Sequence, residues 1–192
     1  IFQEKAKKYH TEVHVAEDFQ KEDSLNTFFE NINIALEVAK VLGLDLDKFY
    51  EGMKNYYPDP GAFEIIETPG TVFLNGLSIN DPDSIMLVYH QLLQKYPKED
   101  MTILLNSRND RPSRVLQHIE LLKKLSDHKI ILTGTNTHFI KRKLGKDYVA
   151  RVEILRSVED LKKEKVIFAI GNIASQGMEI LQFFKDAQEV QS

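Results

Sequence analysis

Three arginines gather in one short stretch of the chain, NSRNDRPSR at residues 106–114, directly after the apolar run Ile103–Leu105. Guanidinium groups bind carboxylates and phosphates through paired hydrogen bonds. An arginine near a helix N-terminus also opposes the helix dipole, by roughly 0.3–1 kcal/mol. A protein core has no use for this charge, so the loop faces either water or an anionic ligand. A solvated turn in which an arginine pairs with Asp110 is the alternative.

Small and polar residues also follow three other apolar runs. They are Asn75-Gly76, Thr133-Gly134-Thr135 and Gly171-Asn172. Glycine lets backbone approach a ligand closely, and helices that start just beyond such runs offer free N–H groups to an anion. Turn residues after a strand are common in any protein. Their coincidence after four runs favours a ligand-binding edge.

Two carboxylates, Asp81 and Asp83, stand at the start of a predicted helix. Asp81 is typical of an N-cap, and Pro82 fits the first helical position. No third ligand accompanies the two carboxylates, so the sequence does not favour a metal site here. The six histidines are scattered, and the chain has no cysteine, which excludes disulfides and thiolate nucleophiles.

Apolar periodicity predicts the elements that position these residues. Strands are expected at 71–75, 101–106, 129–134, 151–155 and 165–172, and a helix is expected after each, the fourth from about Ser157. The strands are continuous apolar runs, as in strands buried on both faces. Strand and helix alternation predicts an α/β fold with a doubly wound parallel sheet. Ligands of such sheets bind at the carboxyl ends of the strands.

The first part of the chain follows a different pattern. Helices are expected near residues 1–9, between 21 and 42, and at 45–56, with a strand at 11–16 where TEVHVA alternates. Gly43 is expected to end the second helix. Two prolines and a glycine in YYPDPGAF predict a domain boundary at Pro58–Gly61. We therefore expect two parts, residues 1–57 and 58–192.

Composition limits the possible partners. The 192 residues are 42% hydrophobic and 28% charged, a balance typical of globular proteins. The net charge of −4 argues against nucleic acid as a partner. No apolar run approaches the roughly 18 residues that a membrane span needs. The chain starts with Ile1 inside a predicted helix, which suggests a piece of a longer protein.

Nucleotide-binding motifs are also absent from the sequence. The stretch KLGKDY contains a Gly-Lys pair but lacks the upstream glycine and the Ser or Thr of a phosphate loop. No G-x-G-x-x-G fingerprint follows a strand. The sequence therefore does not predict a nucleotide enzyme that is complete within this chain.

Several stretches together resemble one family. NINIALEVAKVLGL, YYPDPGAF, FLNGLSINDPDS, NSRNDRPSR and IGNI occur in the order and spacing of the carboxyl-terminal half of the poly-γ-glutamate synthase ligase subunit of the CapB/PgsB type. That family is related to the Mur ligases and to folylpolyglutamate synthase. The resemblance covers nearly the whole chain.

The resemblance implies part of an ATP-dependent amide ligase that joins glutamate through γ-linkages. ATP, with Mg²⁺, phosphorylates the terminal carboxylate of the growing chain, and the amine of an incoming glutamate attacks the acyl phosphate. In Mur-type ligases a central domain carries the phosphate loop, and a Rossmann-like carboxyl-terminal domain closes over it as a lid. Residues 1–57 then resemble the helical tail of the ATPase domain, and residues 58–192 resemble the lid. Without the phosphate loop, this chain alone is expected to be inactive.

The resemblance also suggests roles for individual residues. The substrate side, for glutamate carboxylates or phosphate, comprises Asn75, Asn80, Asp81, Ser84, Asn106, Arg108, Asp110, Arg111 and Arg114. Asn31, Gly171 and Asn172 fall on the nucleotide side, with Asn31 matching a residue that faces the adenine. No metal ligand and no catalytic residue is expected in this chain. Ala62 stands where Mur ligases often carry an arginine near the hinge, so that contact with the nucleotide is not expected.

The resemblance further implies partners and a location. The partners are glutamate, the poly-γ-glutamate chain and the membrane subunits of the synthase, at the cytoplasmic face of a bacterial membrane, with this fragment itself soluble. Two alternatives stay open. One is a Mur or folylpolyglutamate-type ligase with another acceptor, and the other is a non-catalytic Rossmann-like binding module.

Overall fold

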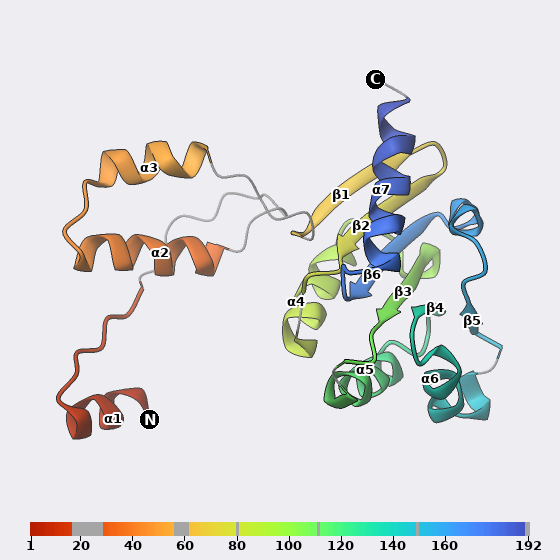
Figure 1. The fold of residues 1–192 in the computed structure, drawn as a ribbon, viewed down its shortest axis with the longest axis horizontal. Helices are drawn as coiled ribbons and strands as arrows, with labels where there is room; N and C mark the ends of the chain where they lie inside the picture. The colour runs from red at the N-terminus through yellow and green to blue at the C-terminus, as the bar shows by residue number, and fades with distance from the viewer. Residues whose placement is uncertain (17–28, 56–61, 80, 111, 149, 191–192) are drawn as a thin grey trace. The chain divides into compact units, whose positions relative to one another are not determined.

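The computed structural model describes residues 1–16, 29–55, 62–79, 81–110, 112–148 and 150–190 (Figure 1). The chain divides into two compact units, Ile1–Pro58 and Asp59–Ser192. The boundary predicted at Pro58–Gly61 lies outside the described residues.

The first unit is helical in its described part. Its helices are α1 (Phe2–Tyr9), α2 (Phe29–Val41) and α3 (Leu46–Lys54). Gly43, with a φ of 64°, follows the end of α2 as predicted. The Asp45 carboxylate then caps α3 by accepting hydrogen bonds from the backbone N–H groups of Asp47 and Lys48.

The strand predicted at residues 11–16 is wrong, because the described segment Thr11–Ala16 has no strand partner. Alternating side chains favour an extended backbone, but a strand forms only when a neighbouring strand satisfies its hydrogen bonds. The side chain of Val15 is 71% exposed, so the apolar side of this segment is not covered by other described residues of the unit.

The second unit is built on one six-stranded sheet with the order β1-β2-β6-β3-β4-β5. Its strands are β1 (Glu64–Thr68), β2 (Thr71–Gly76), β3 (Met101–Ser107), β4 (Lys129–Gly134), β5 (Val152–Ile154) and β6 (Val166–Gly171). Strands β2 to β6 are mutually parallel, which confirms the predicted α/β class and the five predicted strands. The sheet is therefore parallel except at one edge.

Strand β1 was not predicted from the sequence. It runs antiparallel to β2, with Glu64 opposite Asn75 and Thr68 opposite Thr71. Pro69 and Gly70 stand between the two strands, and Gly70 has a φ of 84°, a conformation suited to a tight reversal. The chain thus enters this unit at the end of the sheet where the parallel strands finish.

Helices cover both faces of the sheet. From β2 through β3 and β4 to β5, the chain moves in one direction across the sheet, and β6 is later inserted between β2 and β3. Because parallel crossovers are right-handed, the helices of these three connections lie on one face: α4 (Pro82–Leu92), α5 (Pro112–Lys124) and α6 (Thr137–Leu144). The chain then returns to β6, so its next elements cover the other face, where α7 (Gln176–Glu189) lies across the sheet (Figure 1).

The core under α7 is formed by side chains from the strands, the β5–β6 connection and α7. Phe184 stacks on Phe73 with ring centroids 4.3 Å apart and an interplanar angle of 12°. Leu104, Ile131 and Leu161 belong to the same buried cluster. Because alternate strand residues point to opposite faces, neighbours such as Leu74 and Leu105 are buried toward α4 and α5.

The helix predicted from Ser157 is instead the 3₁₀ helix η3 (Val158–Lys163). Leu161 is the buried residue of η3, and the partly buried Val158 packs against the same core cluster. An α-helix at this place would need an apolar stripe of several residues. Two shorter 3₁₀ turns, η1 (Lys98–Asp100) and η2 (Lys146–Tyr148), precede β3 and β5.

Candidate functional site

The five parallel strands all end on one side of the sheet, which we call the carboxyl edge. Their last residues are Gly76, Ser107, Gly134, Ile154 and Gly171. The strand register places Asn106 opposite both Thr133 and Gly171. Three of the polar segments predicted at strand ends therefore meet here.

Asn106 is only 1% exposed and binds the chain internally. Its side-chain amide donates to the Asn172 carbonyl oxygen at 2.6 Å and to the Ala174 carbonyl oxygen at 3.1 Å. These contacts hold the loop that leads into α7. In this arrangement Asn106 positions the loop, and its amide does not reach the surface as a substrate ligand.

Asn75 has a comparable internal place. It is fully buried, its amide donates to the Ala62 carbonyl oxygen at 3.3 Å, and its side-chain oxygen accepts from the Leu77 backbone N–H at 3.3 Å. Asn75 thereby ties the segment that enters this unit to the end of β2. The structure gives it no surface open to a ligand.

Close backbone packing explains the glycines of the edge. A Cβ on Gly171 would lie 2.4 Å from the Asn106 carbonyl oxygen, and one on Gly134 would lie 2.2 Å from the Ser107 carbonyl oxygen. Both residues also have positive φ angles. Ser175, just before α7, has a φ of 57° without being glycine, a costly conformation that proteins often keep near functional sites.

Arg108 is the exposed cation of the predicted arginine loop. Its guanidinium donates to the Asp110 carboxylate at 2.7 Å and, weakly, to the Asn172 side-chain oxygen at 3.4 Å. Arg108 and Asp110 are about two-fifths exposed, at 41% and 43%, and such surface pairs contribute only about 0–1 kcal/mol. The pairing expected for a solvated turn is present, and it is weak enough for a ligand to displace.

The remaining residues of the predicted substrate group lie elsewhere or are not described. Asp81 caps α4 by accepting from the Ser84 backbone N–H at 2.8 Å, and this hydrogen bond lowers the pKa of Asp81. Arg114 lies on α5 beside buried His118, whose pKa is lowered by burial and by the Arg114 charge. Asn80 and Arg111 lie outside the described residues.

The residues predicted on the nucleotide side fall in different units. Asn31 is exposed on α2 of the first unit. Gly171 is buried, while Asn172 is half-buried and its side-chain oxygen accepts from the Ala174 backbone N–H at 2.8 Å. Gly171 and Asn172 therefore make contacts within the protein that stabilise the fold.

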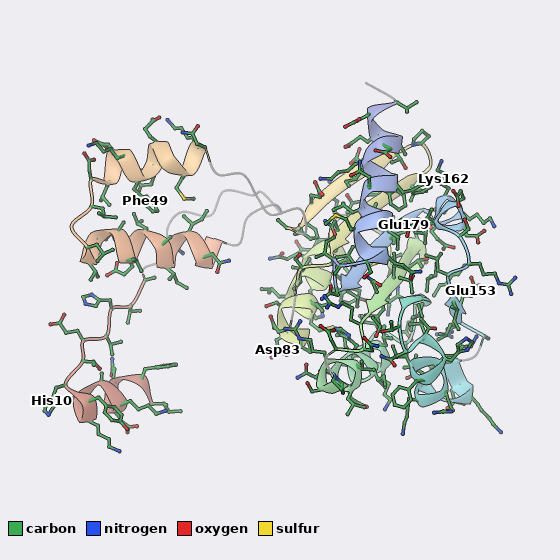
Figure 2. All side chains as sticks on the ribbon, viewed as in Figure 1. His10, Phe49, Asp83, Glu153, Lys162 and Glu179 are labelled. Atoms are coloured by element: carbon green, nitrogen blue, oxygen red, sulfur yellow. The ribbon has the colours of Figure 1, made fainter. Side chains whose placement is uncertain are left out.

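A cleft of about 260 Å³ opens at the carboxyl edge beside this cluster. Its lining includes Thr133, Arg156, Glu159, Gln176 and Glu179. The Gln176 side-chain oxygen accepts from the Thr133 hydroxyl and, at 2.6 Å, from the Gly134 backbone N–H, which joins the start of α7 to the end of β4. Figure 2 labels Glu179 on α7 at this end of the sheet.

The cleft carries charges of both signs. Among the described residues Arg156 forms no ion pair within 4.0 Å, and its charge contributes, after the larger effect of Lys163, to the lowered pKa of nearby Asp160. The Ser157 hydroxyl donates to the Glu159 carboxylate and lowers its pKa, which keeps that group anionic. A cation beside carboxylates suits a ligand with both a carboxylate and an amine, such as an amino acid.

Sequence reasoning missed Arg156, Glu159, Gln176 and Glu179. Arg156 was within reach of the strand-end rule, because it directly follows the strand predicted at 151–155. Gln176 and Glu179 carry no such signal, since they lie on the first turn of a helix. Gln176 and Glu179 line the same cleft only because α7 packs close to the end of β4.

No group of three or more His, Asp and Glu side chains in the described part of the chain is arranged to hold a metal ion. Mg²⁺ prefers several oxygen ligands, including carboxylates. The described residues therefore do not fit a Mg²⁺ site of their own. Likewise, no helix among them is long and apolar enough to span a membrane.

The family model of the poly-gamma-glutamate synthase CapB C-terminal domain matches residues 63–187. The chain belongs to this CapB family. It is 31% identical to PGA synthase CapB of Bacillus subtilis over 90% of this chain, and 26% identical to the capsule biosynthesis protein CapB of Bacillus anthracis over 97%. It spans about half of those relatives, 50% and 45% of their lengths.

Solved structures of Mur ligases share the fold. A MurF from Acinetobacter baumannii matches with a TM-score of 0.58, covering 84% of this chain and 37% of that one. MurF of Thermotoga maritima, in complex with ADP, and folylpolyglutamate synthase of the same organism each give a TM-score of 0.53, covering 86% and 85% of this chain and 40% and 39% of theirs. Each is 16% identical to this chain, so the likeness concerns the fold.

Proposed function

We propose that this chain is the carboxyl-terminal part of an ATP-dependent ligase that joins glutamate residues through γ-amide bonds. Membership of the CapB family and the shared fold of Mur and folylpolyglutamate ligases support this proposal. The structural observation that carries it is the carboxyl edge, where Arg108 forms a surface pair with Asp110 that a ligand can displace and Arg156 lines the cleft. Residues 58–192 would act as the lid, and residues 1–57 as the tail of the ATPase domain.

The cleft at the carboxyl edge is suited to the glutamate that supplies the amine. Arg156 can bind a carboxylate in a paired hydrogen-bonded geometry. Glu159 and Glu179, which line the same cleft, can hold the ammonium group. Arg108 extends the positive charge toward the loop of Asn172, where the carboxylate or phosphate of the second substrate would approach.

The reaction has two bond-forming steps. A carboxylate oxygen of the acceptor attacks the γ-phosphorus of ATP, and ADP leaves. The amine, after losing a proton, attacks the carbonyl carbon of the acyl phosphate; an amide forms and inorganic phosphate leaves. The contribution of this chain is to orient the amine and to exclude water when the lid closes.

ATP and Mg²⁺ are assigned to the part of the ligase outside this chain, because the sequence has no phosphate loop and the described residues hold no metal-ligand group. From the first unit, exposed Asn31 is the candidate for contact with the nucleotide. Asn80, Asp81, Ser84, Arg111 and Arg114 stay candidates for the rim of the substrate site. Membrane subunits of the synthase, and a place at the cytoplasmic face of the membrane, belong to the same proposal.

The test replaces Arg108 or Arg156 with alanine in the complete ligase. Hydrogen bonds to a charged group contribute about 1.5–3 kcal/mol, so each change is expected to lower glutamate incorporation by about ten- to a hundredfold. Incorporation of radiolabelled glutamate and release of ADP are measured together. Loss of both signals supports substrate binding by these arginines.

Arg151→Ala is the matched control. Arg151 is also an exposed arginine of this unit, donating to the Ser126 carbonyl oxygen at 2.8 Å, but it stands before β5 at the opposite end of the strand. It should leave incorporation unchanged. Normal incorporation in both Arg108→Ala and Arg156→Ala would exclude the carboxyl edge as the substrate site and favour a non-catalytic binding module.

A further inference from the structure

A second hollow, of about 650 Å³, lies on the β5 side of the sheet. Leu155 and Arg156 line both this hollow and the cleft, so the two are adjacent. We call the larger one the β5 groove; its walls come from β4, β5, α6 and η3. Figure 2 labels Glu153 of β5 on this side of the unit.

The fold explains why a groove exists here. Strand β5 has three residues and is the free edge of the sheet, and the connection that follows it is the six-residue 3₁₀ helix η3. A parallel sheet normally has α-helices over both faces. Because η3 is short and packs on the core mainly through Leu161 and Val158, the sheet beside it stays partly open.

The groove has an apolar floor. Ile131 lies at its base and is only 4% exposed, while Ile154 and Leu155 are half-buried along it. At about 650 Å³ the groove falls within the range of roughly 300–1,000 Å³ that holds ligands larger than one amino acid. The neighbouring cleft, at about 260 Å³, is smaller than that range.

The lining of the groove holds four cations and three carboxylates, so its net charge is +1 with histidine neutral. Each carboxylate lies within 4.0 Å of a lysine: Lys129 lies 2.8 Å from Glu164 and 3.2 Å from Glu153, and Lys163 pairs with Asp160. The other two cations form no ion pair within 4.0 Å in the described structure, although the charge of Arg156 contributes, after the larger effect of Lys163, to the lowered pKa of Asp160. Lys141 donates to the Val152 carbonyl oxygen at 2.7 Å, and Arg156 also lines the neighbouring cleft. The groove therefore favours an anionic ligand with apolar segments.

A γ-linked glutamate chain has this chemistry. Its amide linkage runs through the side-chain carboxyl group, so two methylene groups of each residue lie in the backbone and the α-carboxylate projects from it. Methylenes can cover the apolar floor while carboxylates meet the lysines on the rim. The position of the groove next to the proposed glutamate cleft favours this polymer over an unrelated anion.

We propose that the β5 groove binds the poly-γ-glutamate chain itself, beside the cleft that receives a single residue. This inference rests on the proposed function. The consequence is retention: a polymer held in the groove stays with the ligase between additions, so products grow longer before release.

The test measures binding of fluorescein-labelled deca-γ-glutamate to the 192-residue chain by fluorescence anisotropy, and product length in the complete ligase. Lys163→Glu reverses one charge on the rim, at a side chain that is 74% exposed and does not support the core. We expect about fivefold weaker binding, the factor that roughly 1 kcal/mol produces, and shorter products. Added salt should weaken binding of the unaltered chain.

Lys123→Glu is the matched control, because Lys123 also forms an i,i+3 ion pair, with Glu120 on α5, away from the groove. It should bind the decamer normally, and circular dichroism of both variants checks that they fold. Equal binding of deca-α-glutamate, or equal effects of the two substitutions, would overturn the groove proposal.

The outcomes separate this inference from the proposed function. A ligase that incorporates glutamate while Lys163→Glu changes neither decamer binding nor product length refutes the groove and leaves the function intact. A complete ligase that incorporates no glutamate refutes the function, whatever the chain binds. Arg108→Ala should lower incorporation by about ten- to a hundredfold without weakening decamer binding, since Arg108 does not line the groove.

Discussion

Individual polar residues in this protein divide into those that build the site and those that face it. Asn75 and Asn106 are buried, and their side-chain amides donate hydrogen bonds to backbone carbonyl groups of neighbouring segments. A buried amide left unpaired is costly, so these contacts are part of the fold. Arg108 and Arg156 are exposed, and their guanidinium groups stand at the surface that the asparagines shape.

His128 is a further buried, hydrogen-bonded residue, and it makes the free energy of unfolding depend on pH. His128 is 2% exposed; it donates from Nδ1 to the Met101 carbonyl oxygen and accepts at Nε2 from the Tyr89 hydroxyl. Burial lowers the pKa of His128, with nearby Lys98 lowering it further and Asp127 opposing that effect. The folded state therefore prefers the neutral ring.

The unfolded chain, with a histidine pKa of about 6.5, takes up the proton first as the pH falls. Stability is full above that value and decreases as the pH drops from it toward the lower folded pKa. Urea unfolding at pH 7.5 and 5.5 should show this loss, and His128→Gln should show a smaller one. Some loss should persist, because the pKa of His118 is lowered as well. An unchanged loss in His128→Gln would mean that other groups cause it.

Among the elements, α7 has the most consequences for the site. It covers the core on one face of the sheet, and its first turn contributes Gln176 and Glu179 to the cleft. The loop before it is fixed by Asn106 and contains the strained residue Ser175. Packing of α7 and the geometry of the cleft are therefore linked.

Phe184→Ala tests this link. Phe184 is fully buried against Phe73, and removing such a ring typically costs about 3–5 kcal/mol. Neighbouring Phe183 is only half-buried, with the Lys162 ammonium 4.9 Å from its ring centroid, so Phe183→Ala should cost clearly less. Chemical denaturation of both variants measures the difference. Similar losses would show that the stack does not anchor α7.

At the scale of the whole molecule, the two units differ in how completely they bury apolar residues. The core cluster of the second unit is drawn entirely from residues 66–184. In the first unit, large side chains of α2 and the turn after it stay exposed, including Val38 at 51%, Leu42 at 66% and Leu44 at 54%. This contrast supports the proposal that residues 1–57 belong to a larger domain.

The contrast also predicts how the chain unfolds. Residues 59–192 expressed alone should keep the thermal midpoint of the main transition of the 192-residue chain, because their core needs no side chain from the first unit. Differential scanning calorimetry of the two samples makes the comparison. A midpoint lowered by many degrees in the shorter sample would show that the first unit stabilises the sheet.

Much of the fold was determined by the sequence itself. Continuous apolar runs and turn residues predicted five parallel strands, and Gly43 marked the end of α2. These features can be read from a few consecutive residues. A strand buried on both faces is a continuous apolar run, and a helix end that needs backbone freedom carries a glycine. Residues 11–16 and η3 were mispredicted because pairing and helix type depend on partners far along the chain.

The site was determined by the sequence only in part. The strand-end rule found the carboxyl edge, the composition of residues 106–114 found the arginine loop, and the order of several short stretches pointed to the family. Polar residues after buried strands can be recognised from the sequence alone. Tertiary structure alone decided that Asn75 and Asn106 turn inward and that Arg156, Gln176 and Glu179 line one cleft. The physical reason is that the direction of a side chain and its neighbours are fixed when α7 and η3 pack on the sheet, which no local pattern specifies.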